Sequence, residues 1–240
     1  MCTVVVLVRP RHAWPVVLVA NRDERIDRAW DPPSAWWREH PDIIAGRDRT
    51  AGGTWMGINA DGMTAAVLNR PGSLGPEAGK RSRGELPLLA LAEATRADAV
   101  NTITAIDTGL WRGFNLVIAD RTGASFIRGA GYGHPTAHRL SPGVSMITAH
   151  DPNDRDSPRV ARHLPRFRAA AAPEPSNWDE WRAILADHSG AAGEQINVEP
   201  RAGFGTVCSS FLAIPAKGQP VWLFAAGPPD QALFELVTGE

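Results

Sequence analysis

The sequence is poor in cysteine and lacks any long apolar run. Cys2 and Cys208 are its only cysteines, which excludes the disulfide framework of small secreted proteins. No apolar stretch approaches the roughly 20 residues that a membrane-spanning helix requires. The apolar start is interrupted by Arg9 and Arg11 and is too short for a signal peptide. We therefore expect a cytoplasmic protein without a membrane span.

An excess of charge of either sign is also absent. The formal net charge is -1, so the sequence does not indicate the basic surface that nucleic-acid binding needs. We accordingly predict no nucleic-acid partner. The glycine-rich segment 129–133 lacks the spacing of a dinucleotide motif, and His134 and His138 lack a third ligand, so we also predict no resident cofactor and no metal site. The composition is that of an ordinary globular protein, and 240 residues suffice for a core that needs no disulfide or metal. We expect a single domain over residues 1–240.

Short β-branched and apolar runs predict many strands. Residues 3–8 and 16–20 form the first pair, and the prolines between them predict a hairpin that begins almost at the first residue. Asp61-Gly62 is a second turn signal. Strands are expected at residues 3–8, 16–20, 43–47, 53–59, 63–69, 114–120, 124–128, 144–148, 206–214 and 221–226.

Leucine and alanine at helical spacing predict two pairs of helices. They fall at residues 85–95 and 97–106, and at 157–172 and 177–188, the last capped by Ser176 or Asn177. Segments 31–37, 70–84 and the glycine-rich 129–133 are expected to be loops. The order of strands, helices, strands, helices and strands predicts an α+β fold with helices layered on antiparallel sheets.

Cys2 is the first candidate for chemistry. An initiator methionine is normally removed when the next residue is small, and loss of Met1 would place a thiol and a free α-amine on the same residue. An α-amine has an unperturbed pKa of about 7.7–8.0, so it can act as a base at neutral pH. Cys2 would then supply both nucleophile and base. The alternative is that a cysteine in second position has no role.

The tetrapeptide Asn21-Arg22-Asp23-Glu24 follows the second predicted strand. A hairpin would return this segment to the neighbourhood of Cys2. There, Arg22 would stabilise a thiolate or a developing negative charge, and Asp23 would orient the α-amine. The alternative is a solvated turn of charged residues.

Asn69 closes the strand that follows the Asp61-Gly62 turn. An asparagine amide can donate a hydrogen bond to an oxyanion, although asparagine is also common where a strand ends in a turn. Tryptophans 30, 36 and 37 gather in one loop, with Trp55 further along the chain; they would line an apolar pocket or pack within the core. We predict substrate-binding roles for Asn21, Trp36, Trp55 and His150.

Four separated motifs resemble the NRDE family, which includes the transport and Golgi organisation proteins. The motifs are Met1-Cys2-Thr3, Ala20-Asn21-Arg22-Asp23-Glu24, Gly52-Gly53-Thr54-Trp55-Met56-Gly57-Ile58-Asn59 and Gly113-Phe114-Asn115-Leu116. They occur in order and span most of the chain. The resemblance also implies a link to haem trafficking and to acyl-CoA or lipid homeostasis.

The pattern is more distantly similar to choloylglycine hydrolases, penicillin V acylases and acyl-CoA:penicillin-type acyltransferases. These relatives imply the four-layer αββα sandwich of N-terminal-nucleophile hydrolases, with antiparallel sheets. Carried over by position, Cys2 would be the nucleophile and Asn69 the oxyanion donor. Arg22 and Asp23 would take the places of the arginine and aspartate of those enzymes.

Two positions depart from the pattern of these enzymes. Val207 stands where many relatives have an arginine, and Ala149 where they usually have an asparagine; His150, Asp151 or Asn153 would then take over the second role. The sequence therefore predicts an N-terminal cysteine amidohydrolase or acyltransferase that acts on an amide, ester or thioester. The alternative is a non-catalytic protein that binds haem, acyl-CoA or a lipid. The expected partner is a small acyl or lipid-like ligand, haem included, and a homo-oligomer is compatible with the sequence.

Overall fold

The computed structural model describes residues 2–238, which divide into two compact units. The first contains the chain up to Asp27 together with Ser141–Val237, and the second contains Arg28–Leu140. Each unit has one sheet in which all neighbouring strands are antiparallel. Within residues 2–238, no helix is long and apolar enough to cross a membrane.

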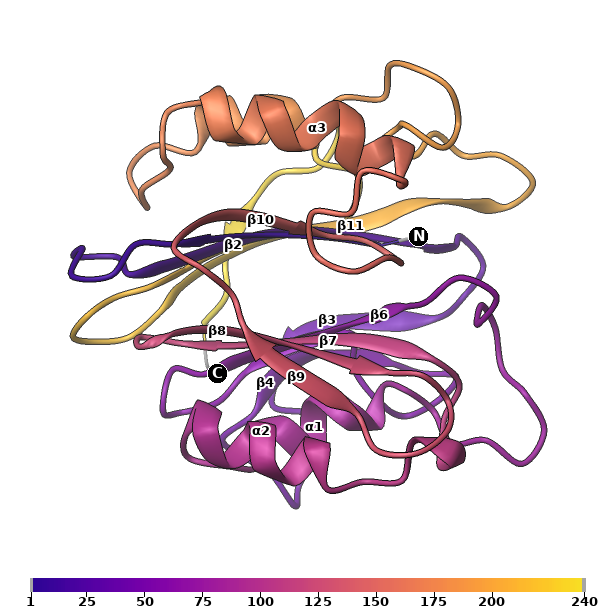
Figure 1. Cartoon of the computed structure of the whole chain (residues 1–240). Helices are drawn as coiled ribbons and strands as arrows, with labels where there is room; N and C mark the ends of the chain where they lie inside the picture. Colours follow the sequence, from indigo (N-terminus) through magenta and orange to yellow (C-terminus); the bar gives the residue numbers. More distant parts are fainter. Residues whose placement is uncertain (1, 239–240) are drawn as a thin grey trace. The chain divides into compact units, whose positions relative to one another are not determined.

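The first unit has a six-stranded sheet with helices α3 and α4 on one face (Figure 1). The helices span Pro158–Ala169 and Asp179–Leu185. In spatial order the strands are β10 (Gly143–Ile147), β1 (Thr3–Val8), β2 (Val16–Arg25), β11 (Phe204–Ile214), β12 (Val221–Ala225) and β13 (Glu235–Leu236).

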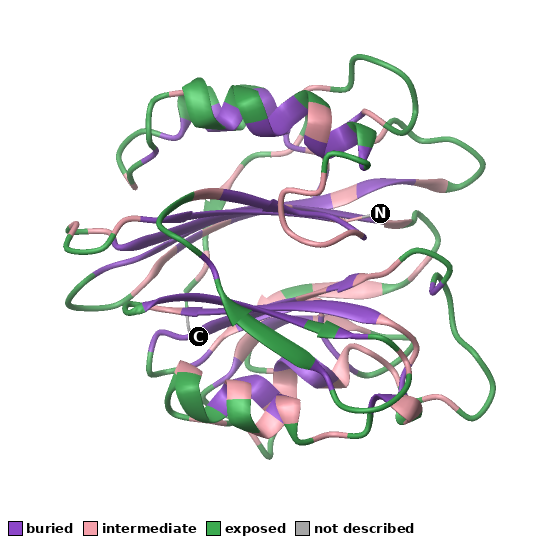
Figure 2. Ribbon diagram, in the orientation of Figure 1, coloured by how far each residue is buried: buried purple, intermediate pink, exposed green. Residues whose placement is uncertain are grey.

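Alternation along the strands decides which residues meet the helices. Successive side chains of a strand point to opposite faces, and every second residue of β1 and β2 packs against α3 and α4. This core contains Val5, Leu7, Val17 and Val19 from the strands with Leu164, Phe167, Trp181 and Leu185 from the helices. Every residue of β1 is buried, as Figure 2 shows for the central strands.

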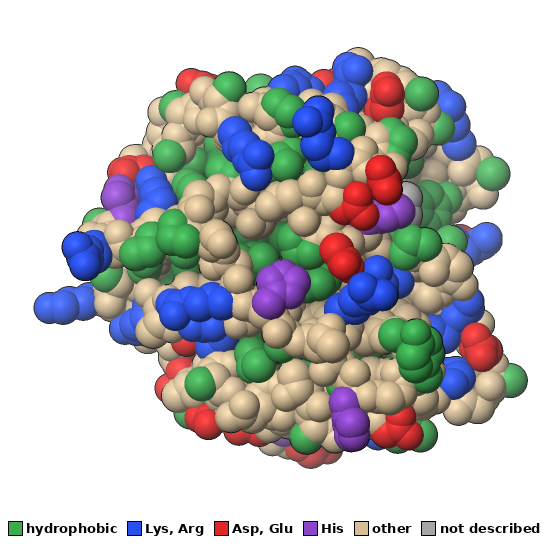
Figure 3. All heavy atoms as spheres, in the orientation of Figure 1, with side chains coloured by type: hydrophobic (Ala, Val, Ile, Leu, Met, Phe, Trp, Pro, Cys, Tyr) green, Lys and Arg blue, Asp and Glu red, His purple; other side chains and the backbone are tan. Residues whose placement is uncertain are grey.

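Helix α3 is amphipathic. Ser157 caps it by accepting a hydrogen bond from the backbone N–H of Val160, and Pro158 occupies its first turn. The solvent-facing side carries Arg162, Arg166 and Arg168, and Figure 3 shows cationic side chains over this helix. Arg159 lies on the opposite, buried side.

The second unit has a seven-stranded sheet with α1 (Glu85–Leu91) and α2 (Arg96–Thr104) packed on one face, and a short 3-10 helix, η1 (Thr108–Leu110). Leu86, Ala90 and Ile103 of the helices enter its core. In order the strands are β3 (Trp30–Ser34), β4 (Ile44–Asp48), β5 (Met56–Ile58), β6 (Thr64–Asn69), β7 (Phe114–Asp120), β8 (Gly123–Gly129) and β9 (Thr136–Arg139).

Close packing against Phe114 of β7 requires glycine at the last position of β8, which is Gly129. A Cβ atom built on Gly129 would lie 2.1 Å from the ring of Phe114, which is fully buried and paired with Gly129 across β7 and β8. Strand β8 therefore ends at a position that only glycine fits, and the glycine-rich loop expected from the sequence begins there.

Most predicted elements are present, and the differences have physical causes. Strand β2 continues through the tetrapeptide to Arg25 because its polar residues have partners inside the protein. Segment 31–37 was expected to be a loop, but residues up to Ser34 form β3, an edge strand that tolerates Pro32 and Pro33. Strands β9 and β13 were not predicted, since both are exposed and lack an apolar alternation.

The cap of the last helix also differs from the prediction. The N-cap of α4 is Trp178, which makes no side-chain capping hydrogen bond, although Asn177 Oδ1 accepts one from the backbone N–H of Asp179 at 3.1 Å. Neither Ser176 nor Asn177 is therefore the N-cap residue.

Candidate functional site

Cys2 lies directly before β1 and is half-buried. Its thiol donates to the backbone carbonyl of Asp23, with Sγ 3.7 Å from the oxygen. Burial raises the pKa of the Cys2 thiol, and the nearby positive charge of Arg22 opposes this rise. Cys2 is therefore anchored to β2 and is held mainly as the neutral thiol.

Strand register places Cys2, Arg22 and Cys208 in one row. The pairing of Thr3 with Asn21 puts Cys2 beside Arg22, and Arg22 is paired with Cys208 on β11. Residues opposite one another on adjacent strands project from the same face. This face is opposite α3 and α4, because Val5 and Val19, at odd positions, meet the helices.

Cys208 is fully buried, and burial raises the pKa of its thiol to about 12. Cys208 lies in the middle of β11 as a small side chain of the core. Cys208 therefore stays protonated at neutral pH and does not compete with Cys2 as a nucleophile.

Asp23 projects to the helix face and forms a buried ion pair with Arg159. Nη1 of Arg159 lies 2.8 Å from Oδ2 of Asp23 and 2.9 Å from the hydroxyl of Thr3. The other carboxylate oxygen accepts from the hydroxyl of Thr206 at 2.8 Å. The backbone of Asp23 thus contacts Cys2, while its carboxylate ties β1, β2, β11 and α3 together.

A β-bulge at Val207 makes this arrangement possible. Thr206 pairs with Asp23 and Cys208 with the adjacent Arg22, so Val207 is an extra residue in β11. The bulge lets Thr206 reach the helix face while Cys208 projects from the other. The position at which relatives carry an arginine is therefore the bulged residue of this strand.

Asn21 is almost fully buried, and both the nitrogen and the oxygen of its side-chain amide form hydrogen bonds. Nδ2 donates to the backbone carbonyls of Leu185 at 3.0 Å and Ile196 at 2.9 Å. Oδ1 accepts from the hydroxyl of Ser209 at 2.7 Å. These contacts fasten the end of α4 to the sheet. They support a structural role, and a role of Asn21 in substrate binding stays a prediction.

The tetrapeptide is not a solvated turn. Asn21, Arg22 and Asp23 are 1%, 5% and 3% exposed inside β2, and only Glu24 approaches solvent. Three polar residues in a buried strand are costly unless their hydrogen-bonding groups are satisfied, which explains why this segment engages α3, α4 and β11. Orientation of the α-amine by Asp23 stays a prediction, because Met1 lies outside the described residues.

His150 follows β10 in a tight loop. Nδ1 of His150 lies 3.5 Å from a carboxylate oxygen of Asp154, and the side chain is partly exposed. Asn153, in the left-handed region at φ 63°, accepts from the backbone N–H of Met146 at 2.8 Å and donates its own N–H to the Met146 carbonyl. Asn153 therefore closes the loop, and Ala149 within it is buried.

Asn69 is the last residue of β6 in the second unit. It pairs with Phe114 of β7 and is half-buried. Next to it, Nη1 of Arg70 donates to Oδ1 of Asn115 at 2.6 Å. The predicted strand end is confirmed, and the oxyanion role of Asn69 stays a prediction.

The tryptophans of the second unit pack against their own neighbours. Trp36 donates from Nε1 to the Pro32 carbonyl at 2.9 Å, and the guanidinium of Arg47 lies 4.3 Å from its ring centre. Trp55 meets Trp30 edge-on, with ring centres 5.7 Å apart. Both rings stay half-buried, so a part in ligand binding remains a prediction.

Arg159 and Thr206 also belong to the network around Asp23, although neither was predicted from the sequence. Arg159 is 4% exposed although it is charged, and it shares the buried side of α3 with His163 and Phe167. Those three residues are four apart, which places them on one helix face. An arginine on the apolar side of a predicted amphipathic helix was the signal that could have revealed a buried ion pair.

Solved structures place this fold in a known class. An N-acylethanolamine-hydrolyzing acid amidase orthologue from Caenorhabditis elegans matches with a TM-score of 0.64 at 12% identity, over 99% of this chain and 100% of that one. Penicillin V acylase from Agrobacterium tumefaciens matches with a TM-score of 0.57 at 16% identity, over 94% and 83%. The fold is therefore the α+β fold of N-terminal-nucleophile hydrolases, as the sequence predicts.

The chain belongs to the Transport and Golgi organisation 2 family, whose model matches residues 1–223. The Transport and Golgi organization protein 2 homolog of Bos taurus is 32% identical over 132 residues, which cover 50% of this chain and 45% of that protein. The match thus spans about half the length of the curated relative. The predicted resemblance is confirmed at the level of the family.

Proposed function

We propose that this chain is an acyl-transfer enzyme in which Cys2 is the nucleophile and an amide, ester or thioester is the substrate. The observation behind this proposal is that strand pairing holds Cys2, directly before β1, beside Arg22 of β2. A nucleophile must be fixed in place beside a group that favours its anionic form. The acyl-amide chemistry named for the two solved neighbours supports this proposal.

The raised pKa of the Cys2 thiol means that attack requires a base. Once Met1 is removed, the α-amine of Cys2 takes the thiol proton while the S–C bond forms at the carbonyl carbon. The amine then delivers that proton to the leaving nitrogen, oxygen or sulfur as its bond to carbon breaks. Water attacks the resulting acyl-enzyme, releases the carboxylic acid and restores the thiol; an amine acceptor would give acyl transfer instead.

Two further side chains support this chemistry. Arg22, nearly buried beside Cys2, stabilises negative charge on sulfur in a setting where solvent screens weakly. Asn69, by resemblance to the related enzymes, donates its amide hydrogen bond to the tetrahedral oxyanion. Arg159 touches Asp23 and Thr3 rather than Cys2, so it acts as a positioning residue for the strands that carry the nucleophile.

A binding protein on the same fold is the second candidate. Val207 and Ala149 replace an arginine and an asparagine of the related enzymes, and Ala149 is only 1% exposed. Such a protein would hold haem, acyl-CoA or a lipid without turnover. Its affinity for that ligand would survive the substitution Cys2→Ala, which separates it from the enzyme.

The decisive comparison uses protein expressed with its own N-terminus and a panel of acyl amides, esters and thioesters. We expect Cys2→Ala to lower turnover to the uncatalysed rate while the thermal unfolding temperature stays close to that of the parent. Cys208→Ala is the matched control, because Cys208 is buried and protonated, and it should retain turnover. Equal rates for the parent and Cys2→Ala would exclude the proposal.

A further inference from the structure

The loop between β10 and α3 lies at the end of the first sheet where Cys2 precedes β1. Val4 of β1 pairs with Ile147, the last residue of β10, so the chain enters this loop at the Cys2 end of the sheet. Where the loop leads into α3, Nη1 of Arg159 donates to the hydroxyl of Thr3 at 2.9 Å. Both ends of the loop are therefore fastened to residues that lie within two positions of Cys2 in the chain.

Internal hydrogen bonds hold this loop in one conformation. Asn153, at φ 63°, exchanges two hydrogen bonds with Met146 of β10, each of 2.8 Å. The backbone N–H of Asp154 donates to the Asp151 carbonyl at 3.2 Å, and the Asp154 carbonyl accepts from the N–H of Ser157 at 3.2 Å. Because its backbone is fixed, the loop can hold a side chain in a defined place beside the start of β1.

His150 and Asp154 form a pair of side chains on this loop. Nδ1 of His150 lies 3.5 Å from Oδ2 of Asp154, and the two side chains are 32% and 34% exposed. A carboxylate beside one ring nitrogen favours the tautomer with its proton there, and it stabilises the imidazolium that forms when the other nitrogen takes a proton. The pair is thus arranged as a general base that is oriented by a carboxylate and is within reach of water.

Two other charged groups near Cys2 cannot serve as this base. The carboxylate of Asp23 is on the helix face of β2, where Arg159 and Thr206 hold it. The guanidinium of Arg22 has no site that accepts a proton. In the proposed reaction the α-amine of Cys2 acts in acylation, and the base for the attacking water is not yet assigned.

We propose that His150, oriented by Asp154, is the general base that activates water for hydrolysis of the acyl-enzyme. Nε2 of His150 takes one proton from water while the water oxygen bonds to the thioester carbon. The C–S bond then breaks, the carboxylic acid leaves, and the imidazolium returns its proton to the sulfur of Cys2. This inference rests on the proposed function, because it concerns the second half of the same reaction.

Rapid mixing of the protein, expressed with its own N-terminus, with p-nitrophenyl acetate separates the two halves of the reaction. The first turnover of nitrophenolate measures acylation of Cys2, and the later steady rate measures hydrolysis of the acyl-enzyme. We expect His150→Gln to acylate at the parental rate but to hydrolyse the acyl-enzyme about 100-fold more slowly, since a general base contributes at least that much. The variant should therefore show a burst of nitrophenolate and an acetyl group in its intact mass.

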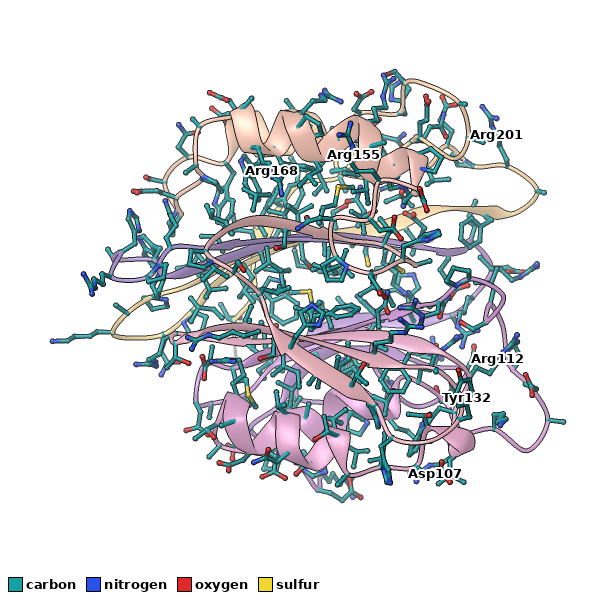
Figure 4. The ribbon with its side chains drawn as sticks, in the orientation of Figure 1. Asp107, Arg112, Tyr132, Arg155, Arg168 and Arg201 are labelled. Carbon is teal, nitrogen blue, oxygen red and sulfur yellow. The ribbon has the colours of Figure 1, made fainter. Side chains whose placement is uncertain are left out.

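Two further variants in the same loop sharpen the test. Asp154→Asn should slow hydrolysis less than His150→Gln does, because the imidazole remains and only its orienting charge is lost. Arg155→Gln is the matched control, since Arg155 is exposed and is labelled next to α3 in Figure 4. It should match the parent in both halves of the reaction.

Hydroxylamine distinguishes loss of a base from distortion of the site. It attacks a thioester without the help of a general base, so it should remove the acetyl group from acylated His150→Gln as fast as from the acylated parent. If His150 only supported the fold around Cys2, the reaction with hydroxylamine would be slowed as well.

The outcomes separate this inference from the proposed function. Equal rates of hydrolysis in the parent and in His150→Gln would overturn the role of His150 and leave Cys2 as the nucleophile. Loss of acylation in His150→Gln would also overturn it, because the residue would then act before hydrolysis. If the parent itself gains no acetyl group, the proposed function fails and the role of His150 fails with it.

Discussion

Among single residues, Asp23 and Arg159 form the buried pair that joins β1, β2 and α3 next to Cys2. The side chains are 0% and 5% exposed. Asp23→Asn keeps the shape but leaves a buried guanidinium without its carboxylate, and such a loss costs about 3–5 kcal/mol. We expect the unfolding temperature to fall by about 2–4 °C for each kcal/mol. Thermal unfolding monitored by circular dichroism measures this change.

The exposed pair of Arg25 and Asp27 supplies the control. Its side chains are 61% and 67% exposed, so water and salt screen the attraction. Asp27→Asn should leave the unfolding temperature unchanged within error. Equal effects of Asp27→Asn and Asp23→Asn would contradict the structural role assigned to the buried pair.

The proximity of Arg22 and Asp23 to Cys2 was predicted from the sequence, because a hairpin brings residue 22 back to residue 2 and short-range pairing can be deduced from turn signals. Arg159 and Thr206 lie far along the chain from Asp23. Only the tertiary packing of α3 and β11 brings them to its carboxylate.

At the scale of elements, α3 contains a pH-sensitive contact at His163. Nε2 of its ring lies 2.8 Å from the Glu194 carbonyl, which assigns the proton to that nitrogen. Nδ1 then accepts from Arg166 at 3.0 Å. Burial is the main cause that lowers the pKa of His163 to about 4, and the positive charges of Arg166 and Arg162 lower it further. The hydrogen bond to the Glu194 carbonyl and the negative charge of Asp187 act in the opposite direction.

The shifted pKa of His163 determines how the stability of the protein changes with pH. The pKa of His163 is lower in the folded protein than its usual 6.5, so the unfolded chain binds more protons between those values. The stability that neutral His163 contributes is complete above pH 6.5 and is lost as pH falls towards about 4. We therefore expect the unfolding temperature to drop on acidification through this window.

Replacement of His163 isolates its contribution to the pH dependence of stability. In His163→Gln, the fall in unfolding temperature between about pH 7 and about pH 5 should be smaller than in the parent, because no buried imidazole resists protonation. His188→Gln, at an exposed histidine in the segment after α4, should retain the parental dependence. An unchanged pH dependence in His163→Gln would show that another group is responsible.

Central elements were easier to predict than edge elements. Strands β1, β6, β7 and β11 are buried along most of their length, so they appear in the sequence as short apolar runs whose ends are marked by turn signals. Edge strands such as β9 lie in solvent, so hydrogen bonding to one neighbour forms them without an apolar pattern. The bulge at Val207 had no sequence signal, because it arises from the competing demands of Thr206 and Cys208 for opposite faces.

At the scale of the whole molecule, fold and family were both predicted from four short motifs in order. The α+β fold requires the strands and helices to alternate in blocks, and this order could be deduced from the sequence. A pocket of the second unit could not be predicted, because it is formed by three segments that are brought together only by folding.

The most direct test of the central claim is the intact mass of the protein, expressed with its own N-terminus, after reaction with an activated acyl ester. We expect loss of Met1 and the addition of one acyl group, which peptide mapping should place on Cys2 and which Cys2→Ala should abolish. A protein that retains Met1 and gains no acyl group, or that is acylated equally in the Cys2→Ala variant, would contradict the assignment of Cys2 as the nucleophile.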